Sequence, residues 1–156
     1  MPDALVGKMP GNGRSPDWLW ARAGVKAVLV RDGRLLLLRR RTDLPLWPGR
    51  WDLPGGGVYR TDLDLESALR RSVLEETGLR IKVEGSVQVT LGRVRQKGER
   101  PFPSVLACFK CRAHSRADPQ LDAAEHTKFV WATRSEGRTL RVVPSLRAAI
   151  EGAFER

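Results

Sequence analysis

The chain has 156 residues, 41% of them hydrophobic, and its 28 Lys and Arg against 18 Asp and Glu give a net charge of +10. This length suits a single domain with a real core. No run approaches the roughly 18 apolar residues of a membrane span, and the first twenty residues lack the basic start and apolar run of a secretory signal. We therefore expect a cytoplasmic protein that does not bind membranes. The positive charge favours an anionic partner such as a nucleotide or a nucleic acid, or else serves solubility alone.

The first third of the sequence predicts an extension, a hairpin and a loop. Residues 1–20 are rich in glycine and proline, so we expect an irregular N-terminal extension and a single domain over residues 21–156. Two apolar runs, 23–31 and 34–41, flank Asp32-Gly33, which is typical of a β-hairpin turn. A loop rich in proline and tryptophan follows and ends in the glycines 55–57.

A helix is predicted next, with signals at both of its ends. Either Asp62 or Asp64 can cap its N-terminus, and Gly78 supplies the C-terminal stop. Between them, the apolar residues recur at helical spacing as Leu65, Leu69 and Val73.

The remaining sequence completes a mixed sheet. Residues 81–94, 104–113 and 128–133 read as strands, and an amphipathic helix begins at 143–144. Cys108 and Cys111 lie on one strand, three residues apart, so they point to opposite faces and are expected to be buried thiols, not a metal pair. This order of elements predicts an α/β (α+β) fold with two helices.

One carboxylate falls where a soluble helix normally has an apolar residue. On a helical wheel, Glu76 lies at about 20° from Leu65, between Leu65 and Leu69, with Glu75 beside the stripe. A carboxylate there is destabilising unless a cation or hydrogen bonds compensate it. Two adjacent glutamates near a glycine-rich loop can offer hard oxygens to a divalent cation. The alternative is an ordinary surface helix, but acidic residues at its C-terminal end would oppose the helix dipole.

The segment from Gly56 to Leu79 resembles the Nudix box. The family pattern is G-x5-E-x7-R-E-U-x-E-E-x-G-U, with U a bulky aliphatic residue, and this chain reads G-x5-D-x8-R-S-V-x-E-E-x-G-L. The preceding W-D-L-P-G-G and the order of strands extend the resemblance to most of the chain. It implies an α/β/α sandwich with a mixed β-sheet between helices. It also implies Mg²⁺, with Mn²⁺ as a substitute, held by Glu75, Glu76 and the Gly55 carbonyl.

The resemblance also implies roles for other residues of the box. Arg71 would orient a carboxylate, and Asp62 would take a loop role near the substrate. Ser72 stands where the family has its first helical glutamate, and one residue is inserted before Arg71. Ser72 still faces the site, yet a hydroxyl is a poor ligand for a divalent ion and no base at neutral pH.

Glu125 is the best candidate to replace the missing carboxylate. It lies in A-A-E-H-T-K-F-V-W, just before a predicted strand, and resembles a late loop carboxylate that many family members place near the metals. It would bind an ion or act as the base that deprotonates water; the alternative is a solvated loop acid. His126 beside it is either a phosphate contact or polar surface.

Together these features predict a Mg²⁺-dependent pyrophosphohydrolase that cleaves a phosphoanhydride bond in a nucleoside diphosphate linked to another group, with a nucleoside triphosphate as the default substrate. The predicted catalytic residues are Glu75, Glu76, Glu125 and Arg71, and the predicted metal ligands are Gly55, Glu75, Glu76 and Glu125. The predicted substrate contacts are Arg40, Arg41, Arg50, Asp62 and Ser72. The alternative is a catalytically weak Nudix-fold module that binds nucleotides or RNA. A homodimer is common among the proteins that this chain resembles.

Overall fold

The computed structural model describes residues 17–155. Their strands are β1 (Arg22–Arg31), β2 (Arg34–Arg40), β3 (Trp51–Asp52), β4 (Ile81–Val94), β5 (Phe102–Ala113) and β6 (His126–Ala132). Their helices are α1 (Leu65–Thr77), α2 (Arg134–Thr139) and α3 (Arg147–Gly152), the last preceded by the 3-10 turn η2 (Pro144–Leu146). None of these helices is long and apolar enough to cross a membrane.

The described strands form one mixed, six-stranded sheet. Its order is β3-β2-β1-β5-β4, and β6 pairs with β2. β1 and β5 run parallel, from the pair Arg22 with Ser104 to the pair Leu29 with Cys111. The other pairings are antiparallel.

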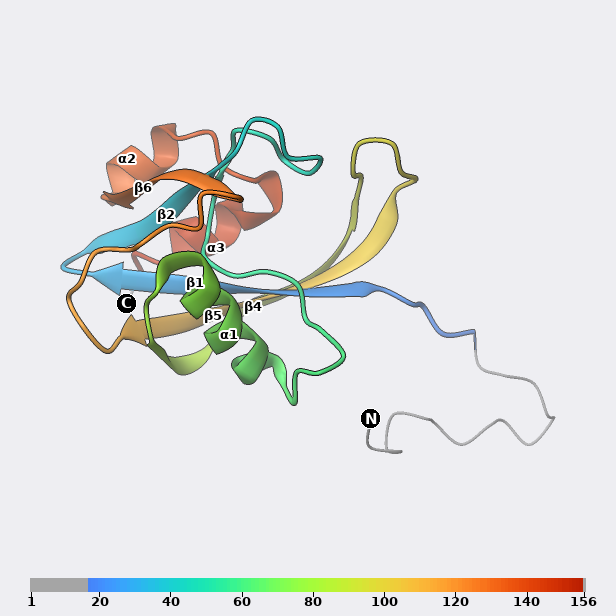
Figure 1. Ribbon diagram of the computed structural model, residues 1–156, viewed down its shortest axis with the longest axis horizontal. Coiled ribbons are helices and arrows are strands. Elements are labelled where there is room, and N and C mark those ends of the chain that lie inside the picture. The colour runs from blue at the N-terminus through green and yellow to red at the C-terminus, as the bar shows by residue number, and fades with distance from the viewer. Residues whose placement is uncertain (1–16, 156) are drawn as a thin grey trace.

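Helices cover both faces of the sheet, as Figure 1 shows. Buried side chains form one core on each face. On one face, α1 packs through Leu69 and Val73. On the other face, η2 and α3 pack through Leu146 and Ile150. The run Leu35–Leu38 in β2 is buried throughout because its alternate side chains enter the two cores. The predicted α/β/α sandwich is therefore confirmed.

The two cysteines follow the same alternation. Cys108 lies in the core under α3 and Cys111 in the core under α1, and both are free, buried thiols. Burial raises the pKa of the Cys108 thiol to about 11, so it stays protonated at neutral pH.

The predicted hairpin turn is present, but the hairpin is short. Asp32 and Gly33 both have positive φ, 53° and 72°, as a type I′ turn requires. β1 and β2 then pair only near the turn, at Val30 with Leu35 and Arg31 with Arg34. Beyond that point the glycine loop runs beside β1, where Ala27 N donates to the Pro54 carbonyl at 2.7 Å.

Helix α1 has the two ends that the sequence predicts. The Asp64 side chain accepts from Ser67 N, and Gly78 takes a φ of 70° and donates to the Leu74 carbonyl. Asp64 is therefore the cap, which leaves Asp62 for the loop. The buried stripe begins at Ala68, however, and Leu65 is 42% exposed. Helical periodicity shows which face of a helix is apolar, but it does not show at which turn the helix first contacts the sheet. The predicted apolar stripe therefore began one turn too early, at Leu65.

Several element boundaries differ from the prediction. Residues 1–16 of the predicted extension lie outside the described residues, and residues 17–21 have no regular structure. β5 and β6 each begin two residues earlier than predicted, at Phe102 and His126. The two-residue strand β3 was not predicted because so short a run carries no periodicity.

Helix α2 was also missed because its sequence R-S-E-G-R-T has no apolar residue. Its signal is the N-cap Thr133: Glu136 N donates to the Thr133 hydroxyl, which in turn donates to the Glu136 carboxylate. Such a cap stabilises the start of a short helix that has no apolar stripe.

The close approach of the glycine loop to β1 gives a first test. Gly55 has a φ of +131°, and an added Cβ would lie 2.9 Å from the Lys26 Cα and closer still to the Val25 carbonyl. We expect Gly55→Ala to lower the free energy of unfolding by at least about 3 kcal/mol in urea titrations, because backbone must move on both sides. Gly57→Ala is the matched control, since its Cβ would meet only the Tyr59 ring at 3.7 Å. Equal stability of the two variants would contradict the tight docking of the loop.

Candidate functional site

A polar cavity of about 190 Å³ lies where the glycine loop, the C-terminal half of α1 and the segment before β6 meet. Its walls carry both signs of charge. The lining residues are Lys26, Arg40, Leu44, Gly55, Gly56, Gly57, Tyr59, Ser72, Glu75, Glu76, Asp122 and Glu125.

Glu76 is the buried acid of this cavity. It is 7% exposed, and its Oε2 accepts from Gly55 N at 2.9 Å. Burial raises the pKa of its carboxyl from 4.5 to about 8, while Lys26 and the Gly55 N–H lower it and the charges of Asp52 and Glu125 raise it further. In the absence of a further cation, most of this carboxyl therefore carries a proton at neutral pH.

Two basic side chains that line the cavity share one buried carboxylate. Lys26 Nζ donates to Asp52 Oδ2 at 3.0 Å and to the Gly55 carbonyl at 2.9 Å. Arg40 donates to the same Asp52 oxygen at 3.2 Å and to the Leu46 carbonyl at 2.9 Å. The second oxygen of Asp52 is buried without a hydrogen-bond partner. Asp52 thus holds both cations at the cavity wall.

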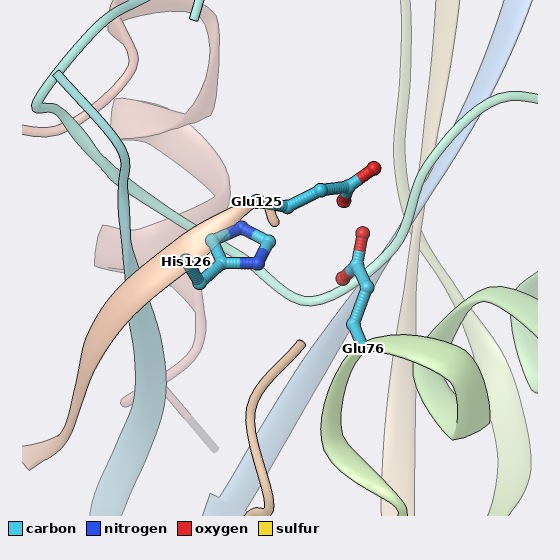
Figure 2. A group of neighbouring side chains, drawn as sticks. All are labelled: Glu76, Glu125 and His126. Carbon is cyan, nitrogen blue, oxygen red and sulfur yellow. The ribbon is translucent and has the colours of Figure 1, made fainter. Parts of the chain in front are cut away.

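A turn before β6 brings Glu125 to Glu76. Glu125 N and His126 N both donate to the Asp122 carbonyl at 3.1 Å, and Asp122 N donates to the Glu76 carbonyl at 3.2 Å. Arg41 N donates to the Glu125 carbonyl at 2.9 Å, which ties the turn to the end of β2. The two carboxylates approach from different elements and point toward one another, as Figure 2 shows.

His126 lies beside the two carboxylates at the start of β6. Its ring is 2% exposed, and neither ring nitrogen has a hydrogen-bond partner. Burial lowers its pKa to about 4, against the opposing charge of Asp52, so the imidazole is neutral near pH 7. Ligand atoms of Glu76, Glu125 and His126 all lie within 4.8 Å of one another.

Arg71 organises the loop between the glycines and α1. Its guanidinium donates to both oxygens of Asp62 at 2.9 Å and to the Gly57 carbonyl at 2.9 Å, and it stacks on the Tyr59 ring. These bonds to Arg71, and then the Tyr59 N–H, hold the pKa of Asp62 below its usual range. Arg71 also donates to Glu75 at 3.2 Å.

The adjacent glutamates therefore differ. Glu76 turns inward, whereas the Glu75 side chain is 59% exposed and paired with Arg71 at the rim of the cavity. Neighbouring residues on a helix are separated by about 100°, so Glu75 stays at the rim when Glu76 faces the interior of the cavity.

Ser72 lies one turn before Glu76 and is buried. A Cβ added to Gly56 would lie 2.8 Å from the Ser72 hydroxyl, which shows how closely the helix approaches the loop there.

The structure gathers six of the predicted site residues around the cavity: Arg40, Gly55, Ser72, Glu75, Glu76 and Glu125. The other four do not line it. Arg41 binds Asp43 and the Ala123 carbonyl, and Arg50 donates to the Val142 carbonyl. Asp62 and Arg71 bind one another outside the cavity.

Sequence reasoning missed Lys26, Asp52 and Asp122 as parts of the site. Lys26 interrupts an apolar strand at an alternating position, which is also the pattern of a solvent-facing residue, so the sequence alone does not mark it as part of a site. Asp52 had a clearer signal, since an acid between Trp51 and Leu53 in a buried segment needs a partner.

The side chains of the cavity fit a divalent cation. A buried carboxylate with a raised pKa, a second carboxylate aimed at it and an unpaired imidazole are donor groups that an ion would satisfy together. Glu76 and Glu125 supply two negative charges when ionised, and the ion would replace the proton that Glu76 otherwise holds.

The raised pKa of Glu76 makes a prediction for the metal-free protein. Below about pH 4.5 the carboxyl is protonated in both folded and unfolded chains, whereas above about pH 8 it is ionised in both and its burial destabilises the fold. In EDTA, Glu76→Gln should therefore gain stability over the wild type as the pH rises from 5 to 9, by at most about 5 kcal/mol.

Urea unfolding at the two pH values measures this gain. Glu66→Gln is the control, because Glu66 lies on the same helix and is exposed. A stability difference between Glu76→Gln and the wild type that is the same at pH 5 and pH 9 would show that Glu76 is not a destabilising buried charge.

Comparison with known proteins identifies the family. A family model for the NUDIX domain matches residues 20–151. A MutT-like protein of Streptomyces ambofaciens is 34% identical over 113 residues, which cover 72% of this chain and 64% of that protein. The nucleoside triphosphatase NudI of Enterobacter sp. (strain 638) is 36% identical over 62 residues, or 40% of this chain and 43% of that protein. The aligned parts span less than two thirds of these relatives.

Solved structures agree with this match. The MutT protein of Methanosarcina mazei Go1 superposes with a TM-score of 0.72 at 25% identity, covering 88% of this chain and 95% of that one. The MutT NUDIX hydrolase of Burkholderia pseudomallei gives 0.69 at 27% identity, covering 85% and 97%. With the NUDIX model matching most of its length and the MutT fold in its structure, this chain belongs to the Nudix family.

Proposed function

We propose that the protein is a divalent-metal-dependent pyrophosphohydrolase that cleaves a phosphoanhydride bond in a nucleotide. The observation that carries this proposal is the buried Glu76 carboxylate, which faces Glu125 across a cavity that Lys26 and Arg40 also line. Acidic and basic groups that line one cavity suit a metal–diphosphate complex, because the acids would hold the metal and the bases would meet phosphate oxygens.

When bound, a divalent ion would neutralise charge on the phosphates and lower the pKa of water. Mg²⁺ is the ion expected from the family resemblance, with Mn²⁺ as a substitute. The chain's own contribution is to fix the Glu76 carboxyl against the Gly55 N–H and to keep Glu125 close to it. Glu125 is the less buried of the two carboxylates, so it can exchange a proton with solvent and serve as the base.

Arg40 and Lys26 would bind the phosphates. Both are fixed by Asp52, so they present charge to the cavity without first having to order a flexible side chain. Arg41 and Arg50, which are bound elsewhere, are left to support the loops at the cavity's edge.

A nucleoside triphosphate is the substrate that we propose. The similar NudI proteins are named nucleoside triphosphatases, and their match to this chain covers 36–40% of it at 36–40% identity. The net charge of +10 favours so anionic a substrate.

A panel of nucleotides tests the proposal directly. The wild type is incubated with nucleoside triphosphates and nucleoside diphosphate derivatives in Mg²⁺ or Mn²⁺, and the products are identified by mass spectrometry. From a nucleoside triphosphate we expect a nucleoside monophosphate and pyrophosphate. From a nucleoside diphosphate derivative we expect the monophosphate and the phosphate ester of the attached group. Glu76→Gln should lower kcat by at least about 100-fold because the charge of one metal ligand is lost.

Glu66→Gln should keep the wild-type rate, since Glu66 lies on the exposed face of the same helix. If the protein binds nucleotides but forms no product with either Mg²⁺ or Mn²⁺, the catalytically weak binding module would instead be favoured. If Glu76→Gln keeps the wild-type kcat, the cavity is not the site of hydrolysis.

A further inference from the structure

The His126 ring is a buried group whose hydrogen-bonding needs the described residues do not meet. It is 2% exposed, and both of its ring nitrogens lack a hydrogen-bond partner among the described residues. A neutral imidazole has one N–H donor and one nitrogen acceptor to satisfy. Native proteins rarely leave such groups unpaired when they are buried, and an unpaired one calls for a bound water, ion or ligand.

The ring is aimed at the two carboxylates of the cavity. A ring nitrogen and one oxygen from each of Glu76 and Glu125 lie within 4.8 Å of one another. Figure 2 shows the three side chains converging from α1, from the turn before β6 and from β6 itself. Glu125 and His126 are neighbours in sequence, and the fold brings Glu76 from α1 to them.

The other oxygen expected to bind metal is already paired with a cation. The Gly55 carbonyl accepts from Lys26 Nζ at 2.9 Å, and the same ammonium is fixed by Asp52 at 3.0 Å. A divalent ion placed on that carbonyl would lie next to a positive charge in a poorly solvated place. The atoms that remain free to bind a metal ion therefore lie near Glu125 and His126.

We propose that Glu76, Glu125 and His126 form a mixed oxygen–nitrogen site that binds a nitrogen-preferring divalent ion such as Zn²⁺ more tightly than Mg²⁺. Imidazole is a favoured ligand of Zn²⁺, whereas Mg²⁺ prefers oxygen ligands and water. The inference rests on the proposed function only for the presence of a divalent ion in the cavity.

Asp52 completes this arrangement. A histidine that binds metal usually donates its second ring N–H to a carboxylate or carbonyl, which fixes the ring and its tautomer. The Oδ1 of Asp52 is buried without a partner, and its charge acts on His126. The two groups are not hydrogen-bonded to one another in the structure, and Asp52 Oδ1 would accept from the second ring nitrogen once an ion holds the first.

The chain's two histidines allow a direct spectroscopic test. Ring ¹⁵N–¹H correlation spectra of the full chain are recorded during titration with Zn²⁺ or Mg²⁺, and His114→Gln assigns the signals because His114 is exposed and outside the cavity. We expect one ring nitrogen of His126 to shift and to saturate at one equivalent of Zn²⁺. Mg²⁺ should leave that nitrogen unchanged.

Calorimetry on two variants measures the selectivity. His126→Gln should weaken Zn²⁺ binding at least about tenfold and change Mg²⁺ binding less than about twofold. His114→Gln is the matched control and should bind both ions as the wild type does. The spectra of the wild-type ring decide the question even where His126→Gln fails to fold.

The inference fails if saturating Zn²⁺ leaves the His126 nitrogens unshifted, or if the wild type binds Mg²⁺ as tightly as Zn²⁺. Nucleotide hydrolysis in Mg²⁺ that persists in either case would leave the proposed function standing. Absence of binding for every divalent ion, together with absence of hydrolysis, would overturn both.

Discussion

The structure depends on one buried carboxylate that a folded protein would ordinarily avoid. Glu76 occupies an apolar stripe of α1, where only the Gly55 N–H and the charge of Lys26 favour its ionised form. These two do not offset burial, because the pKa still rises to about 8. A protein that keeps such a group sacrifices stability at that position, and active and binding sites are where this sacrifice is commonly found. A divalent cation in the cavity would offset the destabilising burial of the ionised Glu76 carboxylate.

The surrounding elements all act on the position of this carboxylate. The glycine loop reaches it because Gly55 takes a φ of +131° against β1, where no side chain fits. The turn at Asp122 bonds to the last turn of α1 and carries Glu125 and His126 to the same point. Asp52 forms ion pairs with Lys26 and Arg40, so the positions of these two side chains are already fixed before any phosphate binds. Ser72 leaves the helix with one carboxylate fewer than the family pattern, which increases the weight on Glu125.

The sequence predicted those features that local chemistry determines. Helix α1, its caps, the Asp32-Gly33 turn and the inward direction of Glu76 follow from spacing and turn residues within a few positions. The family resemblance predicted Glu125, and the position of Arg40 beside the box in sequence predicted a phosphate contact; both residues line the cavity. Lys26 and His126 could not be placed, because their roles come from contacts across the sheet with Asp52 and Glu76. Arg41 and Arg50 were predicted to bind phosphate because the sequence shows their charge. It does not show the backbone carbonyls to which their guanidinium groups donate.

The most direct measurement of this account is a ¹³C NMR titration of the Glu76 side-chain carboxyl, made once in EDTA and once with a saturating divalent ion. The account predicts a midpoint near pH 8 without the ion, as burial dictates, and a midpoint lowered by several pH units when the ion competes with the proton. A midpoint near 4.5 under both conditions would mean that Glu76 is solvated and binds no metal, and the central claim would then be wrong.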